Sequence, residues 1–216
     1  MAKTYWLAKV VFLNALAAVA QAQNTTLRYM PFGDSITEIV CCRAKLWEKL
    51  QTTEWGGVNW VGQDGEQLQG HQTNPADVIT MHLSTNDIVQ QNKAVTDIIA
   101  AFSTLVQVMR DSNPQMKIIV AQIIPMGIGG YTTQIQALNK AILPWAVSKN
   151  TTESPIWVVD QYTGFSGSSD LRDGVHPNDS GDTKMANVWY PALVNALSVA
   201  QASKGAARDI EVAFTA

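Results

Sequence analysis

The sequence Leu27-Arg28-Tyr29-Met30-Pro31-Phe32-Gly33-Asp34-Ser35 ends an apolar, strand-like run in a glycine-assisted turn that presents a serine. A serine in a turn that follows a strand has the position of a nucleophile. The same residues also fit the ordinary N-cap of a helix, where Ser or Asp accepts a hydrogen bond from the helix backbone. This stretch alone leaves both interpretations open.

Two later segments favour the nucleophile. Met81-His82-Leu83-Ser84-Thr85-Asn86-Asp87 follows an apolar run that starts at Val78, and it ends in short polar side chains. In open α/β sheets, ligands bind at the carboxyl ends of the strands. Asp173-Gly174-Val175-His176-Pro177-Asn178-Asp179 is a loop with a carboxylate three residues before an imidazole. Ser, Asp and His together form a complete set for nucleophilic catalysis.

Each of these residues also has a structural interpretation. Asn86 fits an Asx-turn, Asp173 fits the cap of the last helix, and His176 fits a surface histidine. The three segments jointly favour catalysis, because a chain with only three histidines places one beside an Asp in a loop bounded by Gly and Pro.

Apolar strands alternate with amphipathic runs of helical length along the chain, which is typical of a parallel sheet with helices on both faces. The expected strands are 27–32, 59–62, 78–83, 117–124 and 156–160, and the expected helices are 44–51, 95–111, 133–149 and 183–202. In the second helix, Ile98, Phe102, Leu105 and Met109 recur at helical spacing, so this stripe is expected to be core. Residues 203–216 lose the periodicity and are expected to form a loose tail.

The three motifs resemble the first, third and fifth sequence blocks of the SGNH (GDSL-type) hydrolases: Gly33-Asp34-Ser35-Ile36, Thr85-Asn86-Asp87 and 173–179. With Arg43-Ala44-Lys45-Leu46-Trp47 after the serine, the motifs are most similar to those of secreted carbohydrate esterases of family three, which include acetyl xylan esterases. The resemblance implies a flavodoxin-like, three-layer α/β/α sandwich with about five parallel strands, and hydrolysis of small acyl esters.

The resemblance also implies a role for each matching residue. Ser35 would attack the ester carbonyl, His176 would act as general base and then general acid, and Asp173 would orient the imidazole. The Ser35 backbone N–H and the Asn86 side-chain amide would stabilise the oxyanion. No metal or other cofactor is expected, since one Asp and one His provide too few ligands.

The second block of the family matches poorly. It usually reads Glu-Gly-His-x-Gly and supplies a third oxyanion donor, whereas this chain runs through a shorter segment, 61–75. We expect Gly70 to be the third donor. If Gly70-His71 align with the motif, Thr73 replaces the functional glycine, and Thr does not easily adopt a positive φ. Ser84 likewise replaces the glycine that usually precedes Thr-Asn-Asp.

The family commonly has a cysteine after the serine, bonded to a partner in a later loop. This chain has only Cys41 and Cys42. Adjacent cysteines rarely form a relaxed disulfide, so their redox state stays open.

The first residues predict a secretory signal peptide, 1–22. Lys3 and Lys9 flank a short apolar run, Val10 to Ala20, that ends in a small-residue cleavage site after Ala22. The run is shorter than the roughly 20 residues of a membrane-spanning helix. A hydrolase domain, 23–202, and the tail, 203–216, would follow. We therefore expect a secreted, extracellular protein.

Composition agrees with one globular domain: 46% of the 216 residues are hydrophobic and 15% are charged. A net charge of −3 disfavours nucleic acid and anionic membranes as partners, and a monomer is expected. Asn24 and Asn150 are expected glycosylation acceptors. Asn178 also fits the pattern but should be unmodified, because a glycan there would block the site.

Two other features have modest functional content. The glycine-rich segment 126–130 has no phosphate-binding Lys-Ser/Thr pattern and is expected to be a flexible loop at the rim of the site. Trp55 and Trp60 fit either a sugar-stacking platform or, more simply, core packing.

Three functions remain open on the sequence. The first is a serine esterase that acts on acetylated or similarly acylated carbohydrate. The second is a catalytically weak or inactive relative that binds polysaccharide, which the shortened second block favours. The third is a broader lipase, although no apolar lid is evident.

Overall fold

A computed structural model describes residues 26–38, 42–62 and 75–215. Within these residues five strands form one parallel sheet in the order β2-β1-β3-β4-β5, as expected for a flavodoxin-like α/β fold. The strands are β1 (Arg28–Gly33), β2 (Asn59–Trp60), β3 (Val78–His82), β4 (Lys117–Gln122) and β5 (Ile156–Asp160).

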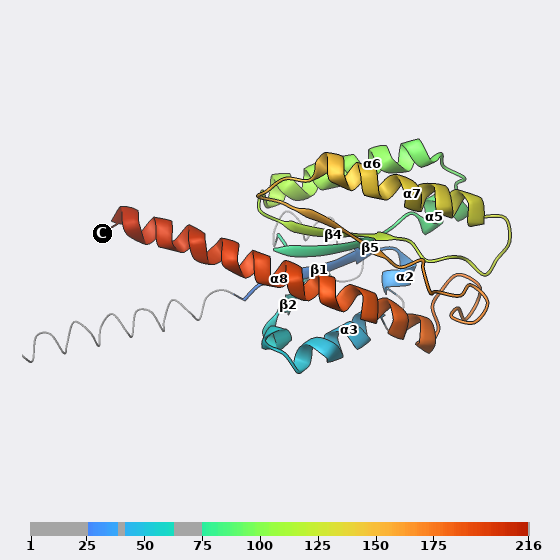
Figure 1. The fold of residues 1–216 in the computed structure, drawn as a ribbon, viewed down its shortest axis with the longest axis horizontal. Coiled ribbons are helices and arrows are strands. Elements are labelled where there is room, and N and C mark those ends of the chain that lie inside the picture. Colours follow the sequence, from blue (N-terminus) through green and yellow to red (C-terminus); the bar gives the residue numbers. More distant parts are fainter. Residues whose placement is uncertain (1–25, 39–41, 63–74, 216) are drawn as a thin grey trace, which may run out of the picture.

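Helices cover both faces of the sheet, so the three-layer prediction is confirmed (Figure 1). One face carries α3 (Cys42–Gln51) and α8 (Asp179–Thr215), and the other carries α6 (Val95–Ser112) and α7 (Thr132–Lys149). Three short elements complete the described chain: α2 (Ser35–Glu38), the 3₁₀ helix η1 (Glu54–Gly57) and α5 (Thr85–Val89).

The core consists of two layers, one on each side of the sheet. All five residues of β3 are buried, because side chains that alternate along a parallel strand enter both layers. Ile79 and Met81 pack in the layer of α6 and α7, whereas Val78 packs in the layer of α3 and α8. The stripe expected on α6 is core, with Ile98, Phe102 and Met109 among its buried members.

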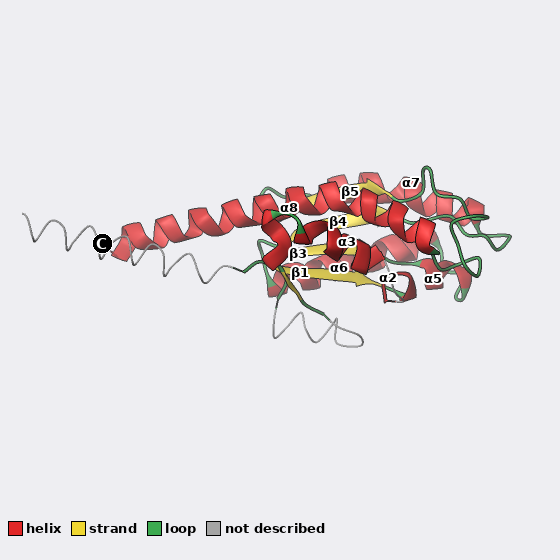
Figure 2. Cartoon of the chain, turned by 90° about the horizontal axis from the view of Figure 1, so that it is seen from below, coloured by secondary structure: helices red, strands yellow, loops and turns green. Residues whose placement is uncertain are grey.

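The last helix is longer than expected and the prediction of a loose tail is wrong, because α8 continues through residues 203–215. Its start is capped by the Asn178 Oδ1, which accepts hydrogen bonds from the backbone N–H groups of Ser180 and Gly181. Near its far end, Lys204 Nζ lies 2.8 Å from the Oδ2 of Asp77, at the amino end of the sheet. The last turns extend past the sheet (Figure 2).

Both candidate stacking tryptophans pack on the layer of α3 and α8. The ring of Trp60 meets that of Tyr29 edge to face, with centroids 4.7 Å apart. This packing is the simpler of the two expected roles.

Several expectations fall outside the described residues: the signal peptide with Asn24, the thiol of Cys41, and the segment 63–74 with Gly70, His71 and Thr73. Cys42 is described, and its side chain is buried in α3. Among the helices described, none has the length and apolar character to cross a membrane.

Candidate active site

The site lies at the carboxyl edge of the sheet. Gly33 at the end of β1 pairs in register with His82 at the end of β3, so Ser35 and Asn86 leave neighbouring strands at the same edge. A side chain at position 33 would collide with the hydroxyl of Thr37 and lie 2.9 Å from the carbonyl oxygen of His82. Only glycine therefore fits this close approach of the nucleophile turn to β3.

Ser35, His176 and Asp173 form a continuous chain of hydrogen bonds. Ser35 Oγ lies 2.9 Å from His176 Nε2, and His176 Nδ1 lies 2.8 Å from Asp173 Oδ2. Because an ionised Asp only accepts, Nδ1 carries the proton of the neutral ring, and Nε2 is free to accept the serine proton. The structure thus brings together the three residues that the sequence nominated from distant segments.

The Asp173 carboxylate is held in its charged form. Its Oδ1 accepts hydrogen bonds from the backbone N–H groups of His176 and Val175, at 2.8 and 2.9 Å. The backbone bond from His176, the ring bond from His176 and the bond from Val175 keep the pKa of Asp173 well below its usual range. The carboxylate can therefore orient the imidazole and stabilise its protonated form.

The loop that carries Asp173 and His176 is closed by its own backbone. Leu171 and Pro177 form an antiparallel bridge, and the N–H of Arg172 donates to the carbonyl of His176 at 2.9 Å. Gly174 has a φ of +84° at the turn, a conformation that favours glycine. A side chain there would also lie 2.9 Å from Cγ2 of Ile128.

A buried carboxylate anchors this loop to α8. Asp170, 2% exposed, accepts hydrogen bonds from the N–H of Ser166, the hydroxyl of Ser180 and the Nζ of Lys184, at 2.7, 3.0 and 2.7 Å. The bond from Lys184 is the main cause that lowers the pKa of Asp170. Sequence reasoning missed Asp170, because its partners lie up to 14 residues away and follow no motif.

Asn178 is part of the same support. Its Nδ2 donates to the carbonyl of Ser169 at 2.8 Å, while its Oδ1 caps α8. A glycan on Nδ2 would compete with this hydrogen bond, which is a further reason to expect an unmodified Asn178.

The glycine-rich loop 126–130 lies beside the loop that carries Asp173 and His176, at the rim of the site, as expected. The N–H of Gly127 donates to the carbonyl of Gly174 at 2.8 Å. This bond ties the loop after β4 to the loop that carries His176. Ile128 is 37% exposed there.

The expected oxyanion donors are described in part. Ser35 is the first residue of α2, and Asn86 lies in the first turn of α5. The Oδ1 of Asn86 accepts a hydrogen bond from Gln90 Nε2 at 3.0 Å, which leaves the Nδ2 group as the end available to donate. Gly70, the third expected donor, is outside the described residues.

Ser84, directly before this helix, has a φ of 91° and is buried. Its hydroxyl has no hydrogen-bond partner among the described residues. The backbone at this position thus has the left-handed conformation that explains why the family usually places glycine here.

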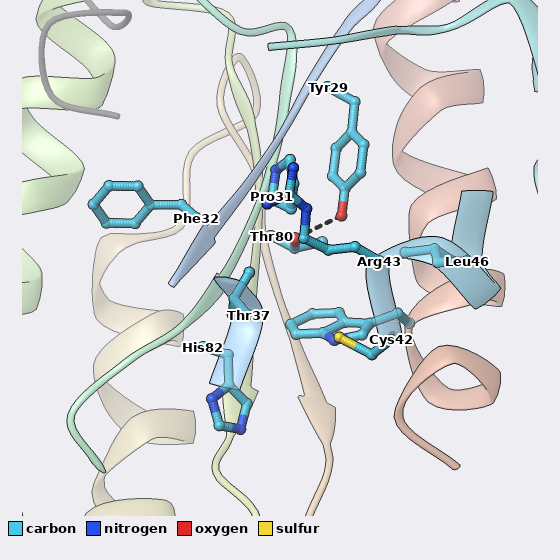
Figure 3. A pocket seen from close by; sticks show the side chains of 10 residues that line it. Tyr29, Pro31, Phe32, Thr37, Cys42, Arg43, Leu46, Thr80 and His82 are labelled. Atoms are coloured by element: carbon cyan, nitrogen blue, oxygen red, sulfur yellow. Dashed lines mark hydrogen bonds between the residues drawn. The ribbon is translucent and has the colours of Figure 1, made fainter. Parts of the chain in front are cut away.

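A pocket between the sheet and the layer of α3 and α8 is lined by none of Ser35, Asp173 and His176; Figure 3 shows its lining residues. Its walls include Tyr29, whose hydroxyl shares a 2.7 Å hydrogen bond with Thr80. Among the described residues its space of about 10 Å³ is that of about one water, which is too small for an ester substrate. In the described part of the chain, no group of three or more His, Cys, Asp or Glu is arranged to hold a metal ion.

The sequence of this chain matches a known family of hydrolases. Residues 32–184 match the family model of the GDSL-like lipase/acylhydrolase family. A search of the curated proteins found no significant match.

Among solved structures, the chain is similar to a carbohydrate esterase family 3 from Talaromyces cellulolyticus, at 30% identity with a TM-score of 0.72, over 80% of this chain and 98% of that one. It is also similar to an acetyl esterase, solved as a serine-to-alanine mutant with an acetate ion, at 28% identity and a TM-score of 0.70, over 80% and 99% of the two chains. A family 3 carbohydrate esterase from Clostridium thermocellum shares the fold at 20% identity and a TM-score of 0.67, over 82% and 100%.

The site lies within the matched residues, and the two neighbours named above that exceed 25% identity are both esterases. The chain belongs to the GDSL-like lipase/acylhydrolase family, and these similarities support an esterase.

Proposed function

We propose that this protein is a secreted serine esterase that removes acyl groups, acetyl above all, from carbohydrate by a Ser-His-Asp mechanism. The observation that carries the proposal is the hydrogen-bonded chain from Ser35 through His176 to Asp173. A serine next to a general base that a carboxylate orients is the arrangement of an activated nucleophile.

In this mechanism the Ser35 Oγ attacks the ester carbonyl carbon while His176 Nε2 takes the hydroxyl proton. The carbonyl oxygen becomes an oxyanion that the Ser35 N–H and the Asn86 amide stabilise. Collapse breaks the bond to the alcohol oxygen, which receives the proton from His176. Water then attacks the acyl-enzyme with His176 again as base, releasing the carboxylic acid and free Ser35.

Surface features near His176 support an ester substrate whose alcohol group is bulky. The departing oxygen must lie within reach of His176 Nε2, because this nitrogen donates the proton to it. The loop 126–130 borders that side through its bond to Gly174. Among the described residues, a side chain at Gly129 or Gly130 would meet nothing within 4 Å, and Ile128 presents an exposed apolar surface. An open, partly apolar rim suits a sugar chain.

The acyl group and the compartment have separate support. Two relatives carry the names carbohydrate esterase family 3 and acetyl esterase, which favours acetate and a sugar. The apolar run before Ala22 favours secretion.

Hydrolysis assays on purified protein test the proposal. Wild type is incubated with p-nitrophenyl acetate and with acetylated xylan, beside Ser35→Ala and His176→Ala. Either variant should lower kcat/KM by at least about 10⁴-fold. Ser198→Ala serves as a matched serine control, because Ser198 is exposed on α8 and its hydroxyl donates to the carbonyl of Val194 on the same helix.

An organophosphonate should label wild type at Ser35 and leave Ser35→Ala unlabelled. Hydrolysis that survives in Ser35→Ala would refute the assignment of the nucleophile. Binding of acetylated xylan without any turnover by wild type would instead establish the inactive, carbohydrate-binding alternative.

A further inference from the structure

His82 is a buried imidazole directly beneath the nucleophile turn. It is the last residue of β3, is 1% exposed and pairs in register with Gly33. Figure 3 shows its ring at one end of the pocket, next to Thr37 of α2. The proposed mechanism uses His176 alone, so a second histidine at this place has no role in it.

The contacts of the ring determine where its proton lies. The backbone N–H of Ile124 donates to His82 Nε2 at 3.5 Å. A nitrogen that accepts a hydrogen bond carries no proton, so the neutral ring is protonated on Nδ1. Burial lowers the pKa of His82, with Asp34 opposing this effect, so the neutral ring is the form present at neutral pH.

Asp34 offers an acceptor that matches this donor. Its Oδ1 accepts a hydrogen bond from the N–H of Ile36 at 3.0 Å and so starts α2 just after the nucleophile. Within the described part of the chain, Asp34 Oδ2 and His82 Nδ1 are both buried without a hydrogen-bond partner. The two groups also interact electrostatically. One buried donor and one buried acceptor on adjacent strand ends are complementary.

We propose that His82 is a positioning residue for the nucleophile: its neutral ring, protonated on Nδ1, attracts the nearby Asp34 carboxylate without a hydrogen bond between His82 Nδ1 and Asp34 Oδ2, and thereby helps to fix the turn that carries Ser35. Asp34 immediately precedes the serine whose N–H would receive the oxyanion. A bare carboxylate there would oppose the developing negative charge, and the polar N–H group of a neutral imidazole close to it offsets that effect. The proposal rests on the role of Ser35 proposed above.

A matched pair of variants separates the two ring nitrogens. In His82→Asn, the side-chain amide places an N–H near the position of Nδ1. In His82→Gln, the amide reaches the position of Nε2 and keeps only the contact with Ile124. His82→Asn should keep kcat for p-nitrophenyl acetate within about threefold of wild type, whereas His82→Gln should lose about 10- to 100-fold with little change in KM. Circular dichroism and thermal melts establish that both variants fold.

Nitrogen-15 NMR of the wild-type histidines provides a readout that does not depend on activity or on variants. The His82 ring should show a protonated Nδ1 and an unprotonated Nε2 at neutral pH and above. A ring protonated on Nε2, or equal activity of His82→Gln and His82→Asn, would overturn the proposal. If wild type hydrolyses no ester at all, the proposed function fails, and the NMR result still decides the state of His82.

Discussion

Replacing Ser84 with glycine should stabilise this protein, which is uncommon for a buried position. Ser84 has φ 91° and ψ 7°, and as the residue before α5 it makes no capping hydrogen bond. A non-glycine residue in the left-handed region costs about 1–2 kcal/mol. Its buried hydroxyl, without a partner among the described residues, costs about 1–3 kcal/mol more.

Glycine removes both costs but adds backbone freedom to the unfolded chain, which opposes the gain by about 0.5–1 kcal/mol. The expected net effect of Ser84→Gly is therefore about 2 kcal/mol of added stability. In a domain of this size that corresponds to a rise in Tm of about 4–8 °C.

Urea unfolding and thermal melts measure the effect, with two controls. Ser84→Ala removes the hydroxyl but keeps the strained backbone, so it should recover only part of the gain. Asn92→Gly changes the other non-glycine residue with positive φ in the described chain, at 47°. Asn tolerates that conformation, so Asn92→Gly should change stability by less than about 0.5 kcal/mol. A Ser84→Gly variant no more stable than wild type would refute the reasoning.

The acid limb of the pH–rate profile should report the ionisation of one imidazole, because the low pKa of Asp173 keeps that carboxylate charged. A second ionisation between pH 5 and 8, with chemistry limiting the rate, would contradict this. Asp170→Asn should lower the free energy of unfolding by about 2–4 kcal/mol. Asp179→Asn, which removes an exposed ion pair with Lys45, should lower it by less than about 1 kcal/mol. Equal losses in urea unfolding would refute the role of Asp170 as the anchor of the loop on α8. Since the folded-state pKa of Asp170 is lowered, the contribution of its carboxylate to the free energy of unfolding should be fully present above about pH 4 and be lost as the pH falls further. The wild type should show this loss, and Asp170→Asn should not. Gly174→Ala should lower kcat/KM by at least about tenfold through strain at φ +84° beside His176, and an unchanged rate would show that the loop adapts.

Sequence periodicity predicted the long elements well, because burial on the sheet imposes it. The strand 156–160 has the expected ends, and the helix at 95 ends one residue later than expected. The short helices α2 and α5 were missed, since one turn is too short to show a period of 3.6 residues. The C-terminal extension was missed because its ion pair, between Lys204 and Asp77, joins residues 127 positions apart.

The site residues also divide into those that the sequence reveals and those that only the fold reveals. Ser35, Asp173 and His176 could be found because they stand in short motifs with a recognisable order. Asp170 could not, since it acts through contacts that exist only in the folded loop. His82 ends an apolar strand, where a single histidine has no distinguishing pattern.

The hydrogen bond between Ser35 and His176 joins residues 141 positions apart in the sequence. A contact of such separation has to close nearly the whole domain, which is the slow, entropically costly part of folding. During synthesis, the serine leaves the ribosome long before the histidine is made. Under the proposed function, a partly folded chain with an intact Ser35 turn is therefore inert, and the first turnover of an ester by a refolding sample reports that the entire sheet has assembled.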